Sequence, residues 1–183
     1  MRLAALAFAL VAGLLAAPAP AQQDFSKVEI KPTKLAEGLW MLEGSGGNLA
    51  VSAGEDATFL VDDQFAPLVP KIFAAIRALT PQPVKFVVNT HWHFDHTGGN
   101  EALGQAGAVI VAHDNSRLRM STDQLIEFLG MRTKPSPKAA LPVITFSADT
   151  TFHLNGDEIH VAHAPRAHTD GDSIVHFRRA DVV

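Results

Sequence analysis

Residues 91–96 place three imidazoles and one carboxylate within six positions, and no other part of the sequence is better suited to chemistry. In an extended chain, side chains two residues apart share a face, so His91 and His93 can bind one ion together. Asp95 and His96 follow, where a turn can direct them towards a second ion. Imidazole and carboxylate ligands favour zinc first, with iron, manganese and nickel as alternatives.

The sequence on either side of residues 91–96 predicts the secondary structure that positions them. Residues 84–90 are rich in β-branched and aromatic side chains and predict a buried strand. A Thr-Gly-Gly-Asn cluster at 97–100 breaks the strand, and residues 101–105 predict a short helix. The run therefore follows the carboxyl end of a strand, where open α/β sheets place their ligands. A set of surface histidines in a loop is the alternative interpretation.

A second candidate, His168, comes more than seventy positions later. It lies beside an Asp-Gly turn signal at 170–171, between two predicted strands. Two histidines and a third from a distant loop form the three-ligand zinc site that leaves one position open for water. On spacing alone, however, a lone loop histidine is more often solvent-exposed than a ligand.

The rest of the chain predicts strands, then strand–helix alternation, then strands again, which indicates a mixed sheet or a sandwich of sheets with helices outside. The Asn155-Gly156 pair predicts a hairpin turn, and the proline-rich segment 135–142 is expected to cross from one layer to the next. We expect helices at 67–79 and 114–131, and further strands at 38–42, 48–52, 57–61, 108–112, 143–146, 151–154, 158–163 and 173–178.

Composition excludes several classes of protein. With 47% hydrophobic and 19% charged residues, the chain is of globular type. A net charge of −4 without a long basic run gives nucleic acid no electrostatic footprint. The absence of cysteine excludes disulfides and thiolate metal ligands within this chain.

The first 21 residues predict a secretory signal peptide. Arg2 precedes an almost wholly apolar stretch at 3–17, and Ala-Pro-Ala at 19–21 has the small-x-small pattern of a cleavage site. The stretch is shorter than the ~20 residues of a membrane-spanning helix, although a retained anchor is the alternative. We therefore expect a single mature domain at 22–183, periplasmic or secreted, without a membrane segment after cleavage.

Residues 91–100 resemble the signature of the metallo-β-lactamase-fold hydrolases. The strand that ends at Asp62 and the segment 167–172 are similar to two further motifs of that family, and the resemblance covers residues 35–178. It implies an αββα sandwich in which one zinc ion is held by His91, His93 and His168, and a second by Asp95 and His96. It also implies a supporting role for Asp62, whose alternative role is to cap a turn.

A histidine directly after the motif aspartate, at position 96, resembles the pattern of glyoxalase II, lactonases and subclass B3 lactamases. We therefore expect a zinc-dependent hydrolase that uses a metal-bound hydroxide on a small-molecule ester, thioester, lactone or β-lactam, with Asp95 orienting the nucleophile. An iron-dependent oxidoreductase or sulfur dioxygenase on the same fold is an alternative. A metal-binding remnant without catalysis is another.

The match to the family stops before the end of its pattern. The second zinc ion of the family also needs a late histidine, and many members add a bridging aspartate, but neither can be placed before Val183. The expectation is a C-terminally truncated domain with a weakened second site, and a short natural form is the alternative. Of the remaining polar residues, His163 and Arg166 lie near His168 in sequence, and Arg166 is a candidate contact for an anionic substrate.

Overall fold

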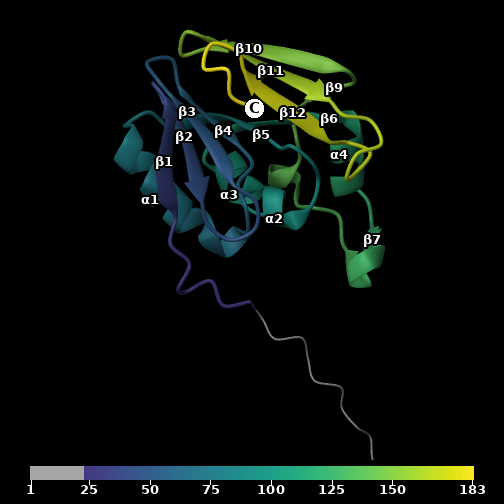
Figure 1. Cartoon of the computed structure of the whole chain (residues 1–183). Helices are drawn as coiled ribbons and strands as arrows, with labels where there is room; N and C mark the ends of the chain where they lie inside the picture. The colour runs from purple at the N-terminus through teal and green to yellow at the C-terminus, as the bar shows by residue number, and fades with distance from the viewer. Residues whose placement is uncertain (1–22) are drawn as a thin grey trace, which may run out of the picture.

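A seven-stranded mixed sheet forms the centre of the molecule, which is described here by a computed structural model covering residues 23–183 (Figure 1). Its strand order is β1-β2-β3-β4-β5-β6-β9. The first four strands pair antiparallel, and β4, β5, β6 and β9 are parallel, so that the carboxyl ends of these four meet at one edge. The strands are β1 (Lys31–Ala36), β2 (Leu39–Glu43), β3 (Leu49–Ala53), β4 (Thr58–Val61), β5 (Val84–Val88), β6 (Val109–His113) and β9 (Ile144–Phe146).

A second, antiparallel sheet of three strands packs on one face of the first (Figure 1). It contains β10 (Asp149–Leu154), β11 (Asp157–His163) and β12 (Ser173–Phe177). The predicted hairpin turn between β10 and β11 is confirmed, since Asn155 and Gly156 have φ values of 54° and 73°. Buried apolar side chains from both sheets fill the space between them, among them Phe59, Val88, Ile159 and Phe177.

Helices cover the other face of the large sheet. The main ones are α1 (Val69–Leu79), which follows the 3-10 turn η1 (Ala66–Leu68), and α3 (Asn100–Gln105). Ile72 and Ile76 are one helical turn apart, so both are buried on the face of α1 that meets the sheet. They form a second core with Leu103 of α3 and side chains of β2 to β6. Helix, large sheet and small sheet thus stack as layers, and the predicted α/β class is confirmed.

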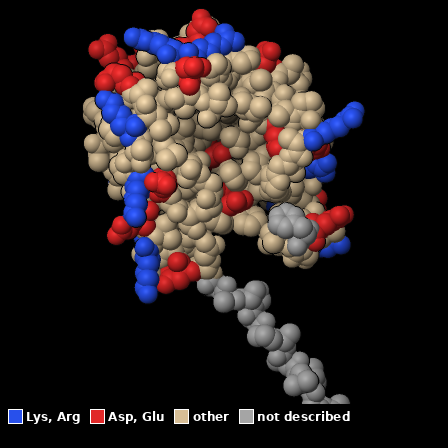
Figure 2. Space-filling view, in the orientation of Figure 1, with Lys and Arg blue, Asp and Glu red and all other residues tan. Residues whose placement is uncertain are grey.

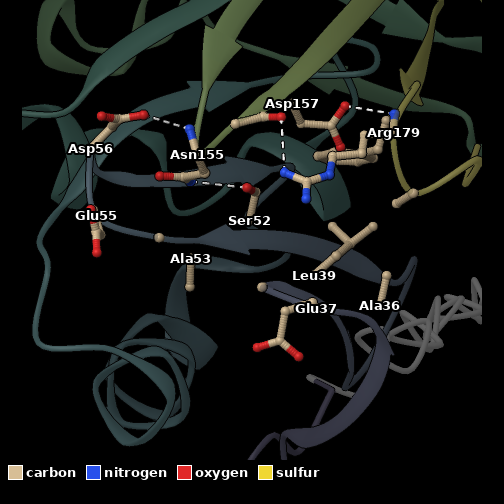
Figure 3. Close-up of a pocket in the computed structure, with 15 residues that line it drawn as sticks. Ala36, Glu37, Leu39, Ser52, Ala53, Glu55, Asp56, Asn155, Asp157 and Arg179 are labelled. Carbon is tan, nitrogen blue, oxygen red and sulfur yellow. Dashed lines mark hydrogen bonds between the residues drawn. The ribbon is translucent and has the colours of Figure 1, made fainter.

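One polar side chain ties the two sheets together far from residues 91–96. Asn155 donates from Nδ2 to Ser52 Oγ and to the carbonyl of Ala57, each at 3.0 Å. Its backbone N–H donates to Asp56 Oδ2 at 2.6 Å. These contacts lie beside a cavity of about 760 Å³, where Arg179 and Asp157 also meet (Figure 3). The β10–β11 turn is therefore fixed to the β3–β4 turn across about one hundred residues of sequence.

The largest difference from expectation lies in residues 114–131, for which the sequence predicted a single helix. The structure has helix α4 (Asp114–Met120), then a small hairpin of β7 (Gln124–Ile126) and β8 (Met131–Thr133) around the 3-10 turn η2 (Glu127–Leu129). Gly130 follows η2 with a φ of 60°, a left-handed conformation that a continuing helix excludes. We call residues 124–133 the hairpin flap, since they project beside the edge of the sheet (Figure 1).

The proline-rich segment at 135–142 also runs differently from the prediction. It contains the 3-10 turn η3 (Lys138–Ala140), which packs against α3, and it leads into β9 of the same large sheet. The chain crosses to the second sheet only after β9, at residues 147–148. The predicted signal peptide at 1–21 lies outside the described residues and stays a prediction. Within residues 23–183, the helices are too short or too polar to span a bilayer.

Candidate metal centre

The backbone after β5 holds the imidazoles of residues 91–96 in a fixed arrangement. His93 is extended and stands directly before the single-turn helix α2 (Phe94–Thr97), and its carbonyl accepts from Thr97 Oγ1 at 3.1 Å. Asn89 and Asn100, both fully buried, exchange side-chain hydrogen bonds of 3.0 and 2.9 Å across the loop. The segment that carries His91 and His93 is thus tied at both ends to the structure around it.

Close packing of glycine completes this loop. A Cβ atom on Gly98 would lie 2.6 Å from the carbonyl oxygen of Gln64 and 2.7 Å from the backbone nitrogen of Ala66. The N–H of Gly98 donates to the same Gln64 carbonyl at 2.8 Å. Only glycine permits this approach, which explains why a Thr-Gly-Gly sequence follows the histidines and brings α2 onto the end of β4.

A separate loop between β11 and β12 presents His168. The carboxylate of Asp172 accepts the backbone N–H of His168 at 2.7 Å and that of Thr169 at 2.9 Å. From α4, Ser116 Oγ donates to the carbonyl of Gly171 at 3.0 Å and Asn115 Nδ2 to that of Asp170 at 2.7 Å. The imidazole is therefore carried by a loop that is anchored both within itself and to α4.

The structure brings His91, His93 and His168 together. One ligand nitrogen from each lies within 4.8 Å of the others, and within residues 23–183 this is the group of side chains arranged to hold an ion. The ring centroids are 4.9 Å apart for His91 and His93, 5.0 Å for His91 and His168, and 4.8 Å for His93 and His168. The distant loop histidine is thus beside the pair, as a shared site requires.

The chemistry of the donors fits a divalent transition metal. His91 Nδ1 lies 3.1 Å from Thr90 Oγ1, whereas its Nε2 is buried and has no hydrogen-bond partner among residues 23–183. A buried nitrogen without a partner is costly in a protein interior, and a metal ion would satisfy it. Burial first, then the neighbouring His96 and His93, lower the pKa of His91 to about 3. Burial also lowers the pKa of His93, so both rings stay neutral, as ligands must be.

Asp95 and His96 lie together beside this triad. His96 Nε2 is 3.6 Å from Asp95 Oδ2, and the rings of His96 and His91 are 4.1 Å apart. His96 Nδ1 lies 2.8 Å from Asp62 Oδ2. Burial would lower the pKa of His96, but the hydrogen bond and charge of Asp62, with smaller contributions from Asp95 and Asp172, raise it above the ordinary value. The two expected ligands of a second ion therefore adjoin the first site.

Asp62 is a buried carboxylate that contacts residues next to the histidine triad. It is 2% exposed, and its carboxylate accepts from the backbone N–H and the hydroxyl of Thr90, both at 2.7 Å, as well as facing His96. Its φ of 58° is a left-handed conformation that is unfavourable for aspartate. Asp62 thus contacts the groups that orient His91 and His96 and does not join the histidine triad.

Two other polar residues weighed in the sequence do not join the triad. His163 stacks on His113 with ring centroids 3.7 Å apart, and its Nε2 lies 3.1 Å from the carbonyl of Asp170. Arg166 is exposed and lines a cleft that contains His163 and His168 but neither His91 nor His93. His113 Nδ1 accepts the N–H of Asn115, so that His113 caps the N-terminus of α4.

Sequence reasoning gave no role to Asp172 or Asp63. The only local signal for Asp172 was an aspartate close after the Asp-Gly turn, a position from which side chains often bond to nearby backbone N–H groups. Asp63 is fully buried, and its Oδ1 accepts the N–H of Gly99 at 2.7 Å, while Oδ2 has no partner. Burial raises the pKa of Asp63 well above its ordinary value. This burial results from tertiary packing and cannot be predicted from the neighbouring sequence.

Comparison with known proteins places this geometry in a family. The sequence profile of the Metallo-beta-lactamase superfamily matches residues 42–183. A metallo-beta-lactamase of Cronobacter sakazakii with a HARLDQ motif is similar in structure, with a TM-score of 0.68, 18% identity, and coverage of 79% of this chain and 56% of that chain. A subclass B3 metallo-beta-lactamase of Bradyrhizobium japonicum is also similar, with a TM-score of 0.65, 21% identity, and coverage of 81% of this chain and 57% of that chain.

A metallo-beta-lactamase from Pontibacter korlensis has a TM-score of 0.64 and 23% identity, with coverage of 82% of this chain and 68% of that chain. The chain thus spans a little over half of the Cronobacter and Bradyrhizobium proteins, at 56% and 57%. These likenesses show a shared fold, and the profile match extends over most of the sequence. The chain belongs to the metallo-beta-lactamase superfamily.

Proposed function

We propose that this chain is a zinc-dependent hydrolase that adds water to the carbonyl of an ester, thioester, lactone or β-lactam. The observation that supports this best is the convergence of His91, His93 and His168, with the buried Nε2 of His91 left without a partner. Zinc on three imidazoles keeps one position for water, lowers the pKa of that water to about 7 and polarises a carbonyl oxygen.

The protein's own groups prepare this site in two ways. Thr90 Oγ1 holds Nδ1 of His91, so that the other ring nitrogen faces the triad. The carboxylate of Asp95 is 32% exposed and lines the same cleft as His93 and His168. We assign Asp95 to orient the attacking water and to accept its proton at a carboxylate oxygen.

Asp95 and His96 also offer a second metal position. His96 Nδ1 is engaged by Asp62, which leaves Nε2 and the Asp95 carboxylate, 3.6 Å apart, to contact an ion. Two protein ligands bind an ion less tightly than three. A second zinc ion is therefore expected to dissociate first when the metal is removed stepwise.

The direct test is hydrolysis by the zinc-loaded chain of a panel containing a nitrophenyl ester, a thioester, a lactone and a β-lactam. We expect zinc-dependent turnover of at least one, lost on chelation and restored by zinc. Asp95→Asn should lower kcat by ~10²-fold or more while one zinc ion stays bound, because a proton acceptor contributes on that scale. Asp149→Asn, which changes an exposed carboxylate on β10, is the matched control.

Two outcomes would overturn the proposal, and each favours a different alternative. Bound zinc without turnover of any compound in the panel would indicate a metal-binding protein without hydrolase activity. Retention of iron in preference to zinc, with oxygen consumption, would indicate an oxidoreductase.

A further inference from the structure

The histidine triad borders one cleft that contains His168 and Arg166, and two clefts that contain both His93 and His168. One of these two has a volume of about 750 Å³ and is bordered by Trp92, Arg119 and the first half of the hairpin flap. The other, of about 370 Å³, is lined mainly by Phe65, Phe94, Ile126 and Leu129. We call the second one the apolar cleft. A small molecule whose reacting group lies between His93 and His168 has room to extend into either of these two clefts.

The apolar cleft carries hydrophobic surface that the fold leaves uncovered. Phe94 is 38% exposed and Leu129 is 52% exposed, although both are large apolar side chains. Phe65 packs on Phe94 with ring centroids 5.8 Å apart and forms a continuous aromatic wall with it. Leu125, on the flap, is 46% exposed and lines the larger cleft. Apolar surface gathered beside a polar reaction site is typical of a pocket that binds an apolar group.

The charges around the clefts disfavour an anion. Among the described residues that line these two clefts, Arg119 is the only lysine or arginine, and Arg166 lines the separate cleft beside His168. The Arg119 guanidinium is already 2.7 Å from Asp170 Oδ2 and 3.3 Å from Gln124 Oε1. Asp95 and Glu127 add negative charge to the lining. Lys and Arg side chains lie mainly around the periphery of this face of the molecule (Figure 2).

We propose that the site selects uncharged carboxylic esters and lactones that carry a straight apolar acyl chain, an inference that rests on the proposed hydrolase function. The chain lies in the apolar cleft against Phe94 and Leu129, which places the carbonyl at His93 and His168. In the reaction, the oxygen of water bonds to the acyl carbon and the acyl carbon–oxygen bond breaks. The leaving oxygen takes one proton of that water and the other is released to solvent, and the products are a carboxylate and an alcohol, or one hydroxy carboxylate from a lactone.

The first test compares p-nitrophenyl hexanoate with p-nitrophenyl acetate, which share a leaving group and differ only in acyl chain length. With the zinc-loaded full chain, kcat/KM should be higher for the hexanoate. Leu129→Ser should reduce the ratio of the two kcat/KM values about 5-fold, since part of an apolar contact of several methylene groups is lost. Leu118→Ser is the matched control, because Leu118 is 58% exposed on α4 and lines neither cleft.

The second test needs no turnover. Binding of 2-octanone, a neutral ketone that cannot be hydrolysed, is followed by NMR of the leucine methyl groups and compared with binding of acetone. We expect 2-octanone to bind more tightly and to shift the Leu129 methyl signals, and Leu129→Ser to weaken its binding about 5-fold while Leu118→Ser does not.

These measurements separate the failure of this inference from failure of the hydrolase proposal. Length-dependent ketone binding that Leu129→Ser weakens supports the apolar cleft even if no ester is hydrolysed. Ester hydrolysis without a preference for the longer chain, or with the same preference in Leu129→Ser, contradicts it. Faster turnover of benzylpenicillin, which carries a carboxylate, than of the neutral hexanoate would also overturn it.

Discussion

Asp62 Oδ2 lies 2.8 Å from His96 Nδ1, although 34 residues separate the two in sequence. The same carboxylate accepts two hydrogen bonds from Thr90, whose hydroxyl also faces His91. One buried carboxylate therefore sets the orientation of imidazoles on both sides of the site. This relationship makes the ionisation of His96 depend on Asp62.

We predict that Asp62→Asn lowers the pKa of His96 from its raised value to below the ordinary range. The amide carries no charge to favour the imidazolium, so only the smaller contributions of Asp95 and Asp172 then oppose the effect of burial. NMR titration of the His96 ring proton in metal-free protein measures this. An unchanged His96 pKa in the variant would show that Asp95 and Asp172, rather than Asp62, hold the proton on His96.

Asp172 is predicted to control metal binding without touching the ion. Its carboxylate accepts the N–H groups of His168 and Thr169 and so fixes the turn that presents the imidazole. Asp172→Ala should weaken zinc binding ~10-fold, the lower end of the effect of removing groups that orient ligands. Asp172→Asn should lose less, because its amide oxygen still accepts one N–H. Chelator competition gives the affinities, with Asp149→Asn as control, and equal affinity in Asp172→Ala would refute this role.

The buried carboxyl of Asp63 predicts a pH dependence of stability. Its pKa is raised in the folded protein, so the folded state keeps a proton that the unfolded state releases above about pH 3.8. Stability is therefore lost as pH rises from the unfolded value through the folded one. Asp63→Asn abolishes this pH dependence. As pH rises over that range, the free energy of unfolding of the variant should therefore increase relative to that of the original chain.

Urea unfolding of the metal-free proteins at a series of pH values measures the difference. Asp123→Asn, at an exposed site with a side chain 67% accessible, is the control and should show no such trend. A gap between Asp63→Asn and the original chain that stays constant with pH would mean that Asp63 ionises in the folded protein as it does in the unfolded one.

Asn155 is predicted to stabilise the sandwich without affecting the metal site. Asn155→Ala removes the two hydrogen bonds that Nδ2 donates at 3.0 Å and the longer one that Oδ1 accepts from Ala57 at 3.4 Å, and it leaves a non-glycine residue at a φ of 54°. The free energy of unfolding should fall by roughly 2–3 kcal/mol. Asn155→Gly, which tolerates the left-handed conformation, should lose about 1 kcal/mol less. Equal losses of stability in the two variants would show that backbone strain at residue 155 does not contribute. A changed zinc affinity in either variant would contradict the expectation that Asn155 does not affect the metal site.

The sequence predicted most strands because their signals are local. β5 and β6 are short apolar runs bounded by breakers, and the Asn155-Gly156 turn specifies its own conformation. Residues 124–129 carry no such signal, because their pattern of one polar residue followed by two apolar ones suits a helical face. The flap hairpin is instead decided by Gly130 and by contacts with α4, such as Arg119 with Gln124.

The residues of the candidate site likewise fall into a group that the sequence indicated and a group that it did not. His91, His93, Asp95 and His96 form a recognisable group because they are adjacent in sequence. His168 lies 75 residues from His93, and only resemblance to a family linked the two before the structure placed them side by side. The support from Asp63 and Asp172 depends on burial and on hydrogen bonds formed after folding, which spacing does not encode.

Zinc titration followed by isothermal calorimetry tests most directly whether His91, His93 and His168 form one metal site. His168 Nε2 already lies 3.0 Å from His93 Nδ1. The chain should bind one zinc ion tightly, and His168→Ala should weaken that binding by ~10²-fold or more, since it removes one of three ligands. His153→Ala, an exposed histidine on β10, should leave it unchanged. Equal affinity of the original chain and His168→Ala would contradict the account.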